Sequence, residues 1–149
     1  MFHEKQSLPQ EERFAVTREL SAEAKLIREE VFMHEQGYKD EFDAIDAHAF
    51  HLVLFVAGEP AGCCRFFAGD APSEWVLGRV AVRKHLRRRG LAGRIVREAL
   101  ARMKELGARS VHLGAQQYAT GLYEQCGFAP CGPVYLDEGN PHVPMSRKL

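Results

Sequence analysis

Positive charge and small residues meet in one short stretch of the chain, residues 80–100. Five basic side chains fall within seven positions there: Arg83, Lys84, Arg87, Arg88 and Arg89. Gly90, Ala92 and Gly93 follow, where the pattern predicts the start of a helix. A helix N-terminus exposes unpaired N–H groups and the positive end of its dipole, so small residues there let an anion approach the backbone. Because arginine can bind phosphate through two parallel hydrogen bonds, we expect a pyrophosphate site at this turn.

The sequence of the turn excludes the two commonest phosphate-binding motifs. It lacks both GxxxxGK[ST] of a P-loop and GxGxxG of a dinucleotide fold. Residues Arg87–Ala92 instead read [Q/R]-x-x-G-x-[G/A], directly after the strand-like Val80–Val82 and directly before an amphipathic helical pattern. In this setting the turn resembles the acyl-CoA site of the GNAT superfamily of N-acyltransferases.

A second segment strengthens the resemblance. Residues 116–128, QQYATGLYEQCGF, are similar to the family's second signature, in which a polar residue opens a helix, a tyrosine follows and Gly-Phe ends it. The segments REEVFMHEQGYKDEFDAIDAHAFHLV and LGAQQYATGLYEQCGFAPCGPVYLDEGNPHVPM resemble the ElaA-like branch, and the likeness extends over nearly the whole chain after residue 13. Two positions depart from the commonest pattern, since asparagine often stands where Gln116 is and glycine where Ala92 is.

The resemblance implies an acetyl-CoA-dependent N-acetyltransferase. The pantetheine arm would pair with the backbone of the strand at Val80–Val82, whose N–H groups would also polarise the thioester carbonyl, on the order of 3 kcal/mol per donor. Tyr123 is the implied general acid for the departing thiolate, with simple packing as the alternative role. The residues expected to bind the cofactor are Val80, Ala81, Val82, Arg87, Arg88, Arg89, Gly90, Leu91, Ala92, Gly93, Gln116 and Tyr123.

The sequence does not single out the group that deprotonates the acceptor amine. Four side chains are candidates for the substrate side: Glu35, His51, His112 and His142. Histidine titrates near neutral pH, which suits a general base, but a lone histidine is more often a hydrogen-bonded packing residue. A water molecule is a further alternative as the proton relay.

The order of apolar patterns predicts an α/β fold with a mixed sheet. Strand-like and helical segments alternate as β-α-β-β-β-α-β-α-β with a possible last strand, an antiparallel meander followed by a β-α-β unit. This order implies helices on both faces of the sheet. Ser21 is expected to cap the first helix, which should end near Gly37, and Gly107 to end the helix that begins at Leu91.

Composition limits the classes of protein to consider. With 149 residues, 46% hydrophobic, we expect a short N-terminal leader over residues 1–12 and one domain over 13–149. No apolar run approaches the roughly 20 residues that span a bilayer, and the start lacks a secretory signal, so a cytoplasmic protein without membrane contact is expected. The four cysteines have neither zinc nor disulfide spacing and are expected to be reduced packing residues.

Two other functional classes compete with an enzyme. A non-catalytic acyl-CoA sensor would keep the cofactor site without the chemistry. A nucleic-acid binder is disfavoured by a formal net charge of +0 and by the lack of aromatic residues among the arginines. No metal is expected, because Asp43, Asp46, His48 and His51 fit helix capping and loop hydrogen bonding, or recognition of an amine, better. The acceptor is expected to be a small-molecule or protein amine, and a homodimer is possible.

Overall fold

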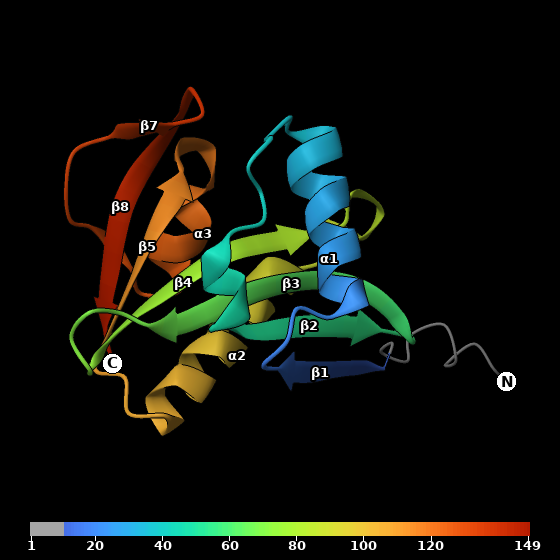
Figure 1. The fold of residues 1–149 in the computed structure, drawn as a ribbon, viewed down its shortest axis with the longest axis horizontal. Helices are drawn as coiled ribbons and strands as arrows, with labels where there is room; N and C mark the ends of the chain where they lie inside the picture. The colour runs from blue at the N-terminus through green and yellow to red at the C-terminus, as the bar shows by residue number, and fades with distance from the viewer. Residues whose placement is uncertain (1–10) are drawn as a thin grey trace, which may run out of the picture.

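A computed structural model describes residues 11–149. They form one eight-stranded sheet in which β1-β2-β3-β4-β5-β8-β6 are neighbours in that order and β7 pairs with β8 (Figure 1). The strands are β1 (Glu12–Thr17), β2 (Phe50–Val56), β3 (Glu59–Ala68), β4 (Glu74–Val82), β5 (Ser110–Gln116), β6 (Ala129–Pro130), β7 (Tyr135–Asp137) and β8 (Asn140–Lys148). The predicted mixed α/β sheet is therefore confirmed. The expected leader, 1–12, lies largely outside the described residues, and β1 already begins at Glu12.

The order of strand directions matches the expected meander followed by a crossover. Strands β1 to β4 are antiparallel neighbours, and β4 and β5 form the parallel pair. The tail, in which the sequence indicated a possible last strand, supplies the nine-residue β8. Strand β8 runs antiparallel to β5 and pairs with all seven residues of β5, from Ser110 to Gln116.

Helices cover both faces of the sheet, as the sequence predicts. The helical segments are α1 (Ala22–Arg28), a π-helix (Glu29–Glu35), 3-10 turns (Ala44–Ala47, Lys84–Leu86 and Gln117–Ala119), α2 (Leu91–Glu105) and α3 (Thr120–Gln125). On one face α1 packs on Val53, Cys63 and Ala81, whereas α2 and α3 join the larger core on the other face. No helix among the described residues is both long and apolar enough to span a membrane.

The first helix begins and ends for local reasons that the sequence partly reveals. The Ser21 hydroxyl accepts a hydrogen bond from the Ala24 N–H, as expected of an N-cap. Its last turns widen into a π-helix, in which the Gln36 N–H donates to the Val31 carbonyl five residues back. A wider turn of this kind is frequent at functional sites, and here it ends the helix beside the opening between β4 and β5.

A buried ionic cluster holds the loop after α1 against the sheet. Arg28, 1% exposed, donates to the carboxylates of Glu41 and Asp46 at 2.8 Å each. Arg65 donates to Asp46 and Asp43, and Asp43 and Asp46 also form a capping box for the 3-10 turn Ala44–Ala47. Burial opposes ionisation of Asp46, but hydrogen bonds from the two guanidiniums outweigh it and lower its pKa to about 2. Helix capping and loop hydrogen bonding are thus confirmed for this segment.

We predict that Arg28→Ala lowers the free energy of unfolding by about 3–5 kcal/mol, because it leaves buried carboxylates without their cation. Denaturant unfolding at pH 7 measures the change. Arg102→Ala, which removes an exposed pair with Glu98 one turn away, is the control and should cost under about 0.5 kcal/mol. Equal losses in the two variants would contradict a stabilising role for the buried cluster.

Candidate active site

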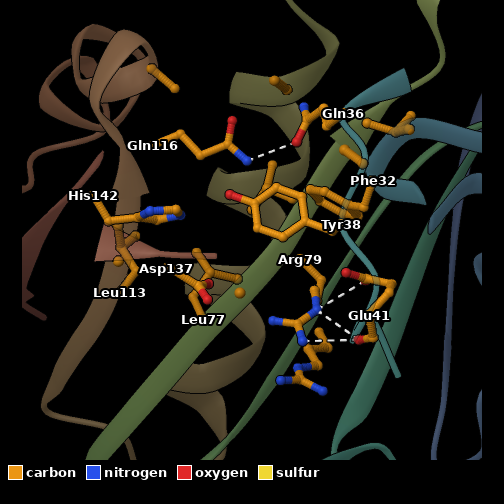
Figure 2. A pocket seen from close by; sticks show the side chains of 18 of the residues that line it. Phe32, Gln36, Tyr38, Glu41, Leu77, Arg79, Leu113, Gln116, Asp137 and His142 are labelled. Atoms are coloured by element: carbon orange, nitrogen blue, oxygen red, sulfur yellow. Dashed lines mark hydrogen bonds and ion pairs between the residues drawn. The ribbon is translucent and has the colours of Figure 1, made fainter. Parts of the chain in front are cut away.

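The two parallel strands separate soon after they meet. Strand β4 pairs with β5 only from Glu74 to Val76, opposite Ser110 to His112. Beyond this point β5 continues along β8, and β4 continues along β3. A groove of about 1040 Å³ opens where they part, lined by both strands, by the end of the first helix and by α3 (Figure 2).

A β-bulge in β4 shapes the wall of this groove. Cys63 faces Ala81 and Arg65 faces Gly78, so Arg79 and Val80 share the single partner position of Cys64. Arg79 adopts a positive φ of 55°, and its guanidinium donates to the Glu41 carbonyl and carboxylate (Figure 2). A bulge bends its strand and leaves backbone groups outside the ladder. The expected cofactor strand, Val80–Val82, lines the groove directly after the bulge.

The N-terminus of α2 has the geometry that an anion site requires. Gly90 is the N-cap, with a left-handed φ of 74° that favours glycine, and no side chain caps the helix. Within residues 11–149, no recorded hydrogen bond uses the N–H groups of Gly90, Leu91, Ala92 or Gly93. Ala92 lines the groove, so the free end of the helix borders it.

The arginines of the turn do not act as one cluster. Arg87 lines the groove, but its guanidinium donates to both carboxylate oxygens of Glu35 at 2.6 and 2.7 Å and to the Val82 carbonyl. A phosphate that binds the Arg87 guanidinium must therefore replace Glu35. Arg88 and Arg89 are exposed and lie outside the groove lining, and Arg83 pairs with Glu30 and Glu59. Gly90, Leu91 and Gly93 also lie outside the groove lining, so Arg87 and Ala92 are the residues of this turn that border the groove.

Tyr123 lies in the groove wall, on α3. Its side chain is buried, and its ring packs edge-on against Phe128 with centroids 6.0 Å apart. Burial raises the pKa of Tyr123 above its usual value near 10. The phenol therefore keeps its proton at neutral pH, as a proton donor must.

Gln116 joins the two sides of the opening. It lies at the end of β5, and its amide nitrogen donates to the Gln36 side-chain oxygen at 2.8 Å (Figure 2). The Gln36 amide in turn reaches the hydroxyl of Tyr118 at 3.2 Å. Gln116 is thus positioned at the groove, and a ligand that takes its amide must replace Gln36.

Three of the four candidate bases are placed unfavourably. His51 is 1% exposed, outside the groove lining, and its Nε2 bonds the Asp46 carbonyl, so its assignment to the substrate side is wrong. His112 is also outside the lining and lies 3.5 Å from Glu74, which corrects that assignment too. Glu35 borders the groove, but its hydrogen bonds from Arg87 lower its pKa and occupy both of its oxygens.

His142, on β8, is the candidate that remains. It is 7% exposed, lines the groove and stacks on Tyr135 with ring centroids 5.6 Å apart. Its Nδ1 lies 2.9 Å from the Asn140 carbonyl, which can only accept, so Nδ1 carries the proton of the neutral ring. The lone pair is then on Nε2, on the ring edge that Figure 2 shows directed into the pocket. Gly114 gives Tyr135 its place, because a Cβ there would overlap the tyrosine hydroxyl.

The sequence of the chain matches that of a known family over nearly all of the described residues. The family description "Acetyltransferase (GNAT) domain" matches residues 14–149, and the chain belongs to this family.

Individual relatives support the same assignment. UPF0039 protein Rv2851c of Mycobacterium tuberculosis is 36% identical over 127 residues, which cover 81% of this chain and 80% of that protein. The crystal structure of Escherichia coli ElaA aligns with a TM-score of 0.79 at 27% identity, covering 93% of this chain and 99% of that one. A Bacillus subtilis acetyltransferase, solved in complex with CoA, shares the fold with a TM-score of 0.75 at 18% identity, covering 93% and 99%.

Several residues of the groove were not anticipated from the sequence. Gln36, Tyr38 and Arg79 line it from the first helix, the following loop and the bulge, and Asp137 and Glu138 line it from the β7–β8 hairpin. Gly78 inside a strand pattern was the one signal for the bulge.

Within residues 11–149, no group of three or more His, Cys, Asp or Glu side chains is arranged to hold a metal ion.

The cysteines differ in burial, which a chemical measurement can test. All four are free thiols; Cys63, Cys64 and Cys126 are buried, and Cys131 is exposed. Burial raises the pKa of Cys63 to about 12 and also raises that of Cys64.

We predict one fast-reacting thiol in the native protein and four after denaturation, measured with a chromogenic disulfide. Cys131→Ser should abolish the fast phase, and a fast phase that persisted would contradict the burial of the others.

Proposed function

We propose that the protein is an acetyl-CoA-dependent N-acetyltransferase that acts on a primary amine of a small molecule or a protein within a ternary complex. The observation that carries the proposal is the opening between β4 and β5 beside the free N-terminus of α2. Membership of the acetyltransferase family and the CoA complex of the B. subtilis neighbour support it.

The residues at the groove fit the cofactor. Among residues 11–149, no strand neighbours Val80–Val82 on the β5 side, so this backbone is available to pair with the pantetheine amides. The N–H groups of Gly90–Gly93, with the dipole of α2, suit a diphosphate. Acetyl-CoA supplies the acetyl group as a thioester, and all other roles fall to side chains and backbone of this chain.

His142 is the proposed general base. A lysine-like amine of pKa about 10.4 is only roughly 0.04% neutral at pH 7, so a group at the site must take its proton. The Nε2 lone pair of His142 is directed into the groove and has no recorded partner among the described residues. His142 accepts the ammonium proton, and the freed nitrogen lone pair forms the new bond to the acetyl carbonyl carbon.

Tyr123 is the proposed general acid. As the C–S bond breaks, its phenol gives a proton to the departing sulfur, so that the products are the N-acetyl amine and the free thiol of CoA. Burial keeps Tyr123 protonated until that step. The attacking nitrogen loses its second proton as the tetrahedral intermediate collapses, and that proton restores the phenol of Tyr123, whereas the proton taken by His142 returns to solvent.

We predict that Ala92→Glu weakens CoA binding at least about tenfold, because it places a carboxylate where the diphosphate would bind. Acidic residues in the first turn stabilise a helix, so the variant should still fold. Calorimetry measures the dissociation constant, and Ala101→Glu, the same change at an exposed position further along α2, is the control. Unchanged affinity in Ala92→Glu would argue against the proposed diphosphate site.

We predict that Tyr123→Phe and His142→Gln each lower kcat on the order of a hundredfold, with CoA affinity largely retained. Release of free thiol from acetyl-CoA in the presence of an amine measures the rate, on a Cys131→Ser background. His112→Gln repeats the histidine substitution outside the groove and should keep full activity. Saturable acetyl-CoA binding without thiol release on any amine would favour a sensor over an enzyme.

A further inference from the structure

The groove carries more negative than positive side chains. Three guanidiniums line it, those of Arg65, Arg79 and Arg87, against six carboxylates, those of Glu35, Asp40, Glu41, Asp43, Asp137 and Glu138. Arg87 pairs with Glu35, Arg79 with Glu41, and Arg65 with Asp43. Asp40, Asp137 and Glu138 have no ion pair recorded within residues 11–149.

These three carboxylates lie together at one end of the groove. The two oxygens of Glu138 accept hydrogen bonds from the backbone N–H groups of Lys39 and Asp40, at 3.1 and 3.2 Å. This contact joins the tip of the β7–β8 hairpin to the loop after the first helix. Asp137 precedes Glu138 in the hairpin and points into the pocket (Figure 2). Negative charge is therefore concentrated at the acceptor end, away from α2.

Two further groups at this end suit a cationic amine. The Tyr38 ring lies in the middle of the pocket, and an aromatic face attracts a cation (Figure 2). Burial, followed by the negative charge of Asp137, raises the pKa of Tyr38. His142, 7% exposed, directs its unpartnered Nε2 into the same space. A buried acceptor for a proton and three exposed carboxylates without a recorded ion pair thus line one cavity.

The register of the β7–β8 hairpin sets the distance between His142 and Asp137. His142 pairs with Tyr135, and Asn140 pairs with Asp137, so the proton acceptor and the carboxylate are two residues apart along the hairpin. His142 and Asp137 lie on opposite strands of the hairpin, and such diagonal neighbours are about 7–8 Å apart. With bonds of about 1.5 Å at tetrahedral angles, roughly four methylene groups between two nitrogens cover nearly that distance.

We infer that the acceptor is a small linear diamine or polyamine, whose reacting amine lies at His142 and whose second ammonium lies at Asp137. The inference rests on the proposed function, because it names the substrate class of the same site. The Glu138 contact closes the hairpin onto the loop beside this end of the groove, which favours a slender free chain over a folded polypeptide.

Three amines of equal chain length test the inference: 1,4-diaminobutane, butylamine and 4-aminobutanoate, whose far ends are positive, neutral and negative. Thiol release should give a kcat/KM for the diamine severalfold above that of butylamine, about fivefold at most, with 4-aminobutanoate the poorest. The preference should shrink in high salt. Butylamine or 4-aminobutanoate equal to or better than the diamine would overturn the inference.

Matched variants test whether Asp137 in the hairpin causes the preference for the diamine over butylamine. Asp137→Asn should reduce the ratio of diamine to butylamine severalfold, whereas Asp70→Asn, the same change at an exposed position outside the groove, should leave it unchanged. Thermal unfolding checks that both variants fold. An unchanged ratio in Asp137→Asn would overturn the role of Asp137.

Binding measurements distinguish a wrong substrate class from a wrong proposed function. Calorimetry on the protein saturated with CoA compares the three amines without turnover, and the diamine should bind most tightly. Equal affinities for all three would overturn the substrate class even if acetyl transfer occurs. Absence of saturable acetyl-CoA binding would instead refute the proposed function itself.

Discussion

The separation of β4 from β5 beyond Val76 is the constraint on which the site depends. Two parallel strands that stayed paired would bury the backbone of Val80–Val82 in the ladder and leave no groove. The bulge at Arg79 bends β4 away, and β8 holds β5 along its whole length on the other side. The groove is therefore set by the hydrogen-bonding pattern of the sheet, and side chains decide what can bind in it.

A buried ionic cluster links this opening to the first helix. Arg28 holds Glu41 and Asp46, and Glu41 also accepts from Arg79 at the bulge. The same helix widens before it ends and presents Glu35 and Gln36 to the groove. One network of charges thus fixes the loop, the bulge and the helix end relative to one another. Arg28 and Arg79 therefore stabilise the fold around the groove.

Local signals in the sequence predicted the element order and the helix start at Gly90, whereas the role of Tyr123 was implied by the family resemblance. These features depend on glycine conformation, capping and apolar period, which neighbouring residues decide. The pairing of Arg87 with Glu35 joins residues 52 apart in sequence, and no local pattern reveals it. Which of His51 and His142 borders the groove depends on the packing of strands that are far apart in sequence, and Glu138 of the hairpin meets the loop at Lys39 only in the folded chain.

The most direct measurement follows backbone amide signals of the labelled protein by NMR as acetyl-CoA is added. The account predicts saturable shifts concentrated at Val80–Val82 and at Gly90–Gly93, the two backbone segments left free by the parting of the strands and by the uncapped helix. Shifts confined to the exposed arginines and lost in moderate salt, with those amides unmoved, would contradict it.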